Sequence, residues 1–334
     1  MNRKFSAIAL VLVCALVLAA TTVVAAKNPS EQPSISLLAE GLDGASGSTI
    51  GPDGALYVTE GAAGRVSRVD PHTGEVTTFA SGLPQRLIPL GGAIDVAFVG
   101  NTAYVLVTLV GSDLGGNAKV GIYRVDDEDS FTVIADIGEF SLNNPPDTGF
   151  DIPSGLQFAM ETFRGGFLVT DGHLNRVLRI SLEGEVTEMI AFGNIVPTGL
   201  EVHGNTVYMA EAGPNPHLPQ NGKVVTFGLK SGNVTEIASG APLIVDVEFG
   251  LGRSLYALSQ GEFEAGLPDG APAMPNTGSL VDVNSDGTFT VIMEGLNQPT
   301  SLEFIGNTAY VVSLAGEIYK IDHVSGPPYG ASNR

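Results

Sequence analysis

A unit of four β-rich stretches, repeated along the chain, is the sequence feature that most constrains the fold. In residues 197–240 these stretches are 198–202, 207–210, 223–229 and 234–238. Each is rich in β-branched and aromatic residues, and turns of Gly, Asn and Pro separate them. The same order recurs between residues 34 and 324, so a repeat architecture is expected.

Six copies of the unit can be aligned along the chain. The first strands of these copies are predicted to end at Ile50, Phe98, Phe158, Val202, Phe249 and Phe304. Four-stranded units at a spacing of 44 to 60 residues are typical of a propeller. The predicted fold class is therefore all-β: a six-bladed β-propeller with four antiparallel strands per blade.

The sixth copy lacks a fourth strand, and an unassigned strand stands at the other end of the repeat region. Residues 34–39 carry the strand pattern that precedes a Gly-Leu pair in other copies. We expect this N-terminal strand to complete the last blade and close the ring. An open β-solenoid is the alternative, and the displaced strand argues against it. The predicted propeller spans 34–324, with a linker at 27–33 and a flexible C-terminal tail at 325–334.

The first 26 residues have the pattern of a secretory signal peptide. A basic head of Arg3 and Lys4 precedes an apolar run of 16 residues at 5–20, and small residues at 24–26 offer a cleavage site. An uncleaved anchor is the alternative, although the run is short for a membrane span. We expect a secreted or periplasmic protein with no membrane contact after cleavage. The only cysteine, Cys14, lies in this segment, so the mature chain forms no disulfide.

The charge balance narrows the range of partners. The chain has 16 basic and 36 acidic residues, a formal net charge of −20. Nucleic acid and anionic membrane surfaces would be repelled by such a chain. A small molecule or another protein is the expected partner, and the oligomeric state is left open.

Strand order assigns the longer connections to one face of the predicted ring. They are residues 83–93, 109–119, 138–152, 212–222 and 261–278. Insertions gathered on one face of a repeat protein indicate the binding face. The candidate ligand-binding residues on this face are Glu60, Asp171 and Glu211 at the ends of second strands, and His173 and His217 in the loops. His217 lies in a Pro-rich loop and is expected to be an exposed side chain.

Two aspartates are candidate metal ligands. Asp95 and Asp246 each stand in an apolar first strand, in the second and fifth units, which face each other across a ring of six. A carboxylate in such surroundings needs a partner or a cation. Oxygen ligands at a central opening would suit Ca²⁺. The alternative is structural: the aspartates accept hydrogen bonds from neighbouring loop N–H groups, while Glu60, Asp171 and Glu211 pair with Arg65, Arg176 and Lys223.

Local motifs give the repeat a family resemblance. Residues 51–60 read GPDGALYVTE, Asp171 is followed by Asn175, Arg176 and Val177, and a Pro-x-Gly-Leu motif stands at 153–156 and 197–200. The blades resemble those of NHL-type and gluconolactonase-like six-bladed propellers. Over residues 34–324 the chain is most similar to the ScyD/ScyE family of exported propellers. Gluconolactonase-like enzymes imply a divalent metal held by a Glu, an Asn and an Asp, but Gly47 and Ser48 stand near the place of that Glu.

Three functions remain open at this point. The first is an exported propeller that binds a small ligand or protein through its loop-rich face, without chemistry. The second is a Ca²⁺-dependent hydrolase of lactones or esters with a metal at the central channel. The third is a structural interaction module of an exported complex. The sequence contains no HExxH, GxSxG or P-loop motif that would name a reaction.

Overall fold

The computed structural model describes residues 32–146, 152–228, 232–268, 270–324, 326 and 329. The predicted signal peptide and most of the predicted linker lie outside these residues. Within the described part of the chain, no helix is both long enough and apolar enough to cross a membrane.

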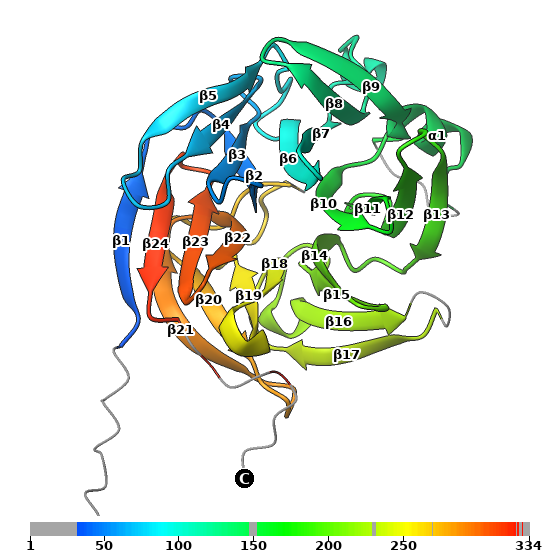
Figure 1. Cartoon of the computed structure of the whole chain (residues 1–334). Helices are drawn as coiled ribbons and strands as arrows, with labels where there is room; N and C mark the ends of the chain where they lie inside the picture. The colour runs from blue at the N-terminus through cyan, green and yellow to red at the C-terminus, as the bar shows by residue number, and fades with distance from the viewer. Residues whose placement is uncertain are drawn as a thin grey trace, which may run out of the picture. The chain divides into compact units, whose positions relative to one another are not determined.

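Six four-stranded antiparallel sheets are arranged as the blades of a propeller, which confirms the predicted fold class (Figure 1). Blades 1 to 3 contain β2 (Ala45–Ile50), β3 (Leu56–Glu60), β4 (Arg65–Val69) and β5 (Val76–Ser81); β6 (Gly92–Val99), β7 (Thr102–Thr108), β8 (Gly121–Asp127) and β9 (Ser130–Asp136); and β10 (Gln157–Phe163), β11 (Gly166–Asp171), β12 (Arg176–Ser181) and β13 (Val186–Ala191). Blades 4 to 6 contain β14 (Pro197–His203), β15 (Thr206–Glu211), β16 (Lys223–Gly228) and β17 (Val234–Ser239); β18 (Ile244–Phe249), β19 (Leu255–Ser259), β20 (Gly278–Val283) and β21 (Phe289–Leu296); and β22 (Pro299–Ile305), β23 (Thr308–Ser313), β24 (Ile318–Asp322) and β1 (Ser34–Ala39).

The N-terminal strand closes the ring, as predicted. β1 pairs antiparallel with β24, with Ser34 opposite Asp322 and Leu37 opposite Tyr319. The innermost strands of neighbouring blades contact one another all the way round, including β22 with β2. Closure leaves only the short outer strands as sheet edges, which limits edge-to-edge association.

The hydrophobic core consists of six clusters, one between each pair of neighbouring blades. Successive side chains of a strand point to opposite faces of its sheet, so each blade packs on both neighbours. In β3, Tyr57 packs toward blade 2, while Leu56 and Val58 pack toward blade 6. Alternate side chains of one strand therefore pack against the two neighbouring blades.

The third blade differs from the sequence-based alignment. Its first strand, β10, runs from Gln157 to Phe163 and does not end at Phe158. The Pro-x-Gly-Leu motif at 153–156 forms the turn before β10, whereas the same motif at 197–200 lies within β14. Gly155 has a φ of +81°, and a Cβ atom there would lie 2.2 Å from an Asp171 carboxylate oxygen. This turn therefore requires glycine at position 155. The Pro-x-Gly-Leu motif thus adopts different conformations at its two positions in the chain.

Among the described residues, helical segments occur only in the connections. The helix α1 (Ile137–Asn143) follows β9, and three 3-10 turns occur at η1 (Ser112–Leu114), η2 (Pro219–Asn221) and η3 (Leu251–Arg253). The two described residues of the predicted tail contact the loop around η3. The Ser254 hydroxyl donates to Gly326 O at 2.6 Å, and Tyr329 N donates to Arg253 O at 2.8 Å.

Candidate functional site

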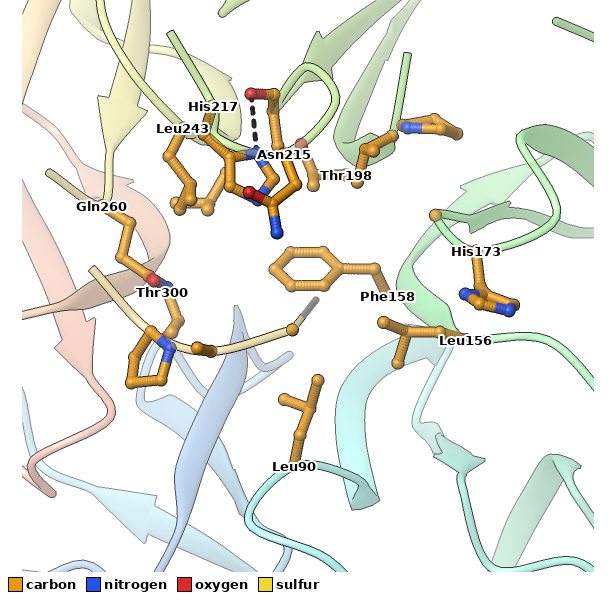
Figure 2. Close-up of a pocket in the computed structure, with 18 of the residues that line it drawn as sticks. Leu90, Leu156, Phe158, His173, Thr198, Asn215, His217, Leu243, Gln260 and Thr300 are labelled. Atoms are coloured by element: carbon orange, nitrogen blue, oxygen red, sulfur yellow. Dashed lines mark hydrogen bonds between the residues drawn. The ribbon is translucent and has the colours of Figure 1, made fainter. Parts of the chain in front are cut away.

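A cavity of about 370 Å³ lies on the face that carries the long connections (Figure 2). Most of its lining comes from connections between second and third strands, connections between blades, and the starts of first strands. The lining residues are Ser46, Leu90, Leu156, Phe158, Gly172, His173, Asn175, Asn194, Val196, Pro197, Thr198, Ala212, Pro214, Asn215, His217, Leu243, Val245, Gln260, Gly270, Ala271, Pro272, Thr300 and Leu314. Two of the five predicted ligand-binding residues, His173 and His217, are among them.

His173 stands in the tight turn between β11 and β12. Its Nε2 accepts a hydrogen bond from Ile152 N at 3.2 Å. Its own carbonyl accepts from Asn175 Nδ2 at 3.1 Å, which ties the turn together. With Nε2 accepting, a neutral His173 carries its proton on Nδ1.

His217 is buried, so the expectation of an exposed histidine is wrong. Only 8% of the residue is accessible. Its Nδ1 lies 3.3 Å from Ala212 O, and its ring packs edge-on against Phe263 with centroids 4.9 Å apart. The loop between β15 and η2 folds inward, so that His217 lines the cavity. The Pro-rich composition of the loop did not predict this. The carbonyl contact favours the tautomer that carries its proton on Nδ1.

Phe158 is the residue that sequence reasoning missed most clearly. Figure 2 shows its ring among the labelled lining residues, between Asn215 and Leu90 in the view. It lines both this cavity and a second, smaller cavity of about 40 Å³ deeper in the channel. Ser46, Val245 and Thr300 are also shared by the two cavities. Phe158 therefore stands where an apolar upper compartment meets the lower channel.

Glu60 does not line the cavity, and its carboxylate has several partners. It accepts from Asp43 N at 2.6 Å and from Arg65 Nε and Nη2 at 2.8 and 2.7 Å. The Ser67 hydroxyl also donates to it. The predicted pairing with Arg65 is confirmed. Glu60 therefore has a structural role: it binds Arg65 and Ser67 at the start of β4.

Asp171 is also fully buried away from the cavity. It accepts from Leu174 N at 3.0 Å, Leu156 N at 3.1 Å and Gln157 Nε2 at 3.1 Å. Arg176 Nε lies 3.9 Å from Asp171 Oδ2, so the predicted ion pair is present but long. Burial raises the pKa of Asp171 above its usual value. The carboxylate fixes the turn that holds His173 and the turn before β10, and so shapes two walls of the cavity.

Glu211 makes no ion pair like that of Glu60. The ammonium of Lys223 contacts Glu236 at 2.6 Å instead. Burial raises the pKa of Glu211 to about 7. It does not line the cavity.

Asp95 and Asp246 join neighbouring blades in the channel. Asp95 accepts from Met160 N of blade 3 at 2.6 Å, and Asp246 accepts from Leu302 N of blade 6 at 2.8 Å. Each also accepts from the N–H of the next residue in its own strand, at 2.8 and 2.9 Å. Burial raises the pKa of Asp95 well above its usual value and that of Asp246 to about 7. These contacts match the structural alternative, with strand N–H groups as donors in place of loop ones.

Glycines on the preceding blades make room for both aspartates. A Cβ atom at Gly47 would lie 2.3 Å from Asp95 Oδ1, and one at Gly199 would lie 2.2 Å from Asp246 Oδ1. In the register with β11, Ala159 of blade 3 takes the equivalent position.

Four glutamates at equivalent positions of consecutive blades accompany the aspartates. Glu161, Glu201, Glu248 and Glu303 lie opposite Leu168, Tyr208, Tyr256 and Tyr310 of the second strands. Burial, with the neighbouring carboxylates in all but Glu161, raises the pKa of Glu161 to about 7, that of Glu201 to about 8, and those of Glu248 and Glu303 well above the usual value. In its own blade, each glutamate stands two residues after the position that Asp95 and Asp246 occupy in theirs. This regular spacing is visible in the sequence, but sequence reasoning missed it.

The channel carboxyls do not assemble into a recognisable cation site. Across the described residues, no group of three or more His, Cys, Asp or Glu side chains is arranged to hold a metal ion. The Asp95 and Asp246 carboxylates are already engaged by backbone N–H groups. These residues therefore do not fit the metal set that a gluconolactonase-like site implies, and a metal role for them stays a prediction.

Solved structures share the architecture at low sequence identity. A gluconolactonase from Xanthomonas campestris matches with a TM-score of 0.62 and 11% identity, covering 88% of this chain and 90% of that one. The PQQ-bound aldose sugar dehydrogenase of Streptomyces coelicolor matches with a TM-score of 0.60 and 13% identity, covering 88% and 99%. Virginiamycin B lyase from Staphylococcus aureus matches with a TM-score of 0.52 and 15% identity, covering 87% and 99%.

No protein-family profile and no curated protein sequence matches the chain. Identities this low establish the fold and not the activity. The chain therefore shares its propeller fold with these structures. Membership of the ScyD/ScyE family stays a prediction.

Proposed function

We propose that this chain is an exported propeller of the ScyD/ScyE kind that binds a small molecule in the cavity on its loop-rich face. The observation that carries the proposal is the cavity itself. Its volume of about 370 Å³ falls within the range of about 300–1,000 Å³ that is usual for ligand pockets. Its walls are apolar with a few polar groups, the usual composition of such pockets.

Two further features support a binding role. The lining comes from connections of several blades, so the cavity belongs to the assembled ring and not to one loop. His173 and His217 are both held in place by backbone contacts, at 3.2 and 3.3 Å. Side chains fixed before a ligand arrives lose little entropy on binding.

The test is to fill the cavity. Leu90 lines the cavity, while Leu87 lies in the same connection, is 47% exposed and does not line it. A fragment library is screened by thermal shift against wild type, Leu90→Trp and Leu87→Trp. We expect fragments that stabilise wild type and Leu87→Trp but not Leu90→Trp. A screen without stabilising fragments, or one in which Leu90→Trp responds equally, contradicts the proposal.

A Ca²⁺-dependent hydrolase of lactones or esters is the second candidate. The observation that favours it is the likeness to a gluconolactonase. The test is metal analysis of the purified protein, followed by a lactone and ester panel on wild type, Asp95→Ala and Asp246→Ala. Absence of a co-purifying divalent ion, with a melting temperature unchanged by added Ca²⁺, removes this candidate.

A further inference from the structure

We infer that the cavity selects uncharged, largely apolar ligands and rejects both sugar-like polyols and anions. This inference rests on the proposed function, because it names the class of ligand for the same cavity. It separates this chain from the sugar chemistry that the names of two structural neighbours describe.

The first argument is the absence of charge in the walls. None of the described lining residues is Asp, Glu, Lys or Arg, although the chain has 52 such residues. Large apolar side chains supply most of the surface, from Leu90, Leu156, Phe158, Val196 and Leu243. A cationic ligand would lose its hydration here without gaining a carboxylate partner, and an anionic one would meet no Lys or Arg, only the imidazoles of His173 and His217.

The second argument is that polar lining groups are already used to hold the walls. Asn175 Oδ1 accepts from Ile195 N and Val196 N, both at 2.9 Å. The hydroxyl of Thr198 donates to Ile244 O, and that of Thr300 donates to Ser46 O, both at 2.8 Å. These donors and acceptors face the protein and not the ligand.

The amides on the other side of the cavity are used in the same way. Gln260 Oε1 accepts from Ala273 N at 3.0 Å, and Asn215 Nδ2 donates to Leu267 O at 3.2 Å. Both bonds fix the connection 261–278 beside the cavity, where Gly270, Ala271 and Pro272 line it. A polyol would leave several hydroxyls without partners, and that loss outweighs what the few remaining polar groups return.

The third argument concerns anions in particular. Below Phe158 the channel is lined by Asp95, Glu161, Asp246, Glu248 and Glu303, and by no basic residue among those described. The whole chain adds a net charge of −20. An anionic ligand is therefore disfavoured by desolvation, because this part of the channel offers no basic residue to pair with it, and by the net negative charge of the whole chain.

Phe158 gives the site a preference for flat ligands. Its ring stands where the two compartments meet and presents an aromatic surface to the upper one (Figure 2). Aromatic ligands stack on such a ring in offset or edge-on geometry. A neutral aromatic probe is therefore the most informative ligand.

The experiment compares three probes by isothermal titration calorimetry at pH 7: 2-naphthol, 2-naphthoate and methyl β-glucoside. We expect 2-naphthol to bind wild type at least about tenfold more tightly than either other probe, a difference of 1.4 kcal/mol. Leu90→Trp should weaken 2-naphthol binding about tenfold, and Leu87→Trp should not. Leu314→Trp fills the cavity at another lining position and guards against misfolding of Leu90→Trp.

The contrary outcomes are distinct. If 2-naphthoate or the glucoside binds as tightly as 2-naphthol and is lost in the tryptophan variants, the inference fails while the proposed function stands. If 2-naphthol does not bind at all, the inference fails as well. The fragment screen then decides separately whether the cavity binds any small molecule.

Discussion

Asp95 and Asp246 show how single residues hold the ring together. Each accepts one N–H from its own strand and one from the first strand of the next blade. The first strands of blades 6 and 1 are joined differently, since Ser48 N donates to Ser301 Oγ at 3.1 Å. These contacts satisfy backbone groups in the channel that the innermost strands would otherwise leave without partners.

We predict that Asp95→Ala costs about 1–3 kcal/mol of unfolding free energy, because Met160 N loses its acceptor in a buried site. Asp95→Asn should cost less, since its one amide oxygen can still accept from Met160 N and only the bond from Val96 N is lost. Urea denaturation at pH 7 measures both. Equal losses for the two variants, or a wild-type stability that rises with Ca²⁺ and falls with EDTA, would favour a metal role instead.

The structural role of Asp95 and Asp246, as hydrogen-bond acceptors between blades, was one of two interpretations that the sequence left open. Local pattern placed both aspartates in apolar strands, but it could not say which N–H groups would reach them. That answer depends on the register between blades and on Gly47 and Gly199, whose missing side chains leave the space. His217 is a similar case, because its burial follows from how its loop folds over the channel.

At the scale of elements, a buried arginine makes several contacts with the short helix α1. Arg176 is 1% exposed; its Nη2 donates to Ser141 Oγ and its Nη1 to Asn144 O, both at 2.9 Å. Its guanidinium also lies 5.5 Å from the centre of the Phe140 ring. A lysine at this place cannot make the same set of contacts, because its ammonium is a single point charge.

We therefore predict that Arg176→Lys loosens α1 and lowers stability by about 1–3 kcal/mol, the cost of buried polar groups left unpaired. Hydrogen exchange of residues 137–143 should become faster than in wild type. Arg179→Lys is the matched control, since Arg179 is an exposed position of the same strand. Unchanged exchange in Arg176→Lys, or equal effects of the two variants, would show that α1 is held by its apolar contacts alone.

Strand order was the most predictable part of the fold. Turn residues and alternation located the four strands of each blade, and the surplus strand at 34–39 predicted closure. The exception is β10, where a motif shared with β14 forms a turn that only glycine fits at position 155, beside Asp171. The cavity walls were not predictable to the same degree. Phe158 and Leu90 are ordinary apolar residues until the ring brings distant connections together.

At the scale of the whole molecule, the carboxyls of the channel make stability depend on pH. Burial and mutual repulsion raise the pKa of Glu201 from an ordinary value of 4.5 to about 8, and burial raises that of Glu161 to about 7. The folded state therefore binds these protons more tightly than the unfolded chain. Their contribution is fully present below the unfolded pKa near 4.5 and is lost as pH rises through 7 to 8.

We predict that the melting temperature of wild type falls between pH 5 and pH 8, and that Glu201→Gln reduces this fall. The variant should match wild type at pH 5 and exceed it at pH 8 by about 2–4 °C, the shift expected for roughly 1 kcal/mol. Glu185→Gln, at an exposed turn position, is the control and should follow wild type. A Glu201→Gln profile parallel to that of wild type would refute the prediction.

The most direct test of the central claim is a crystal structure of the protein soaked with 2-naphthol. The account predicts electron density for the probe in the upper cavity, against Phe158 and beside Leu90 and Leu156. Density at another place on the propeller, or an empty upper cavity at a saturating probe concentration, would contradict it.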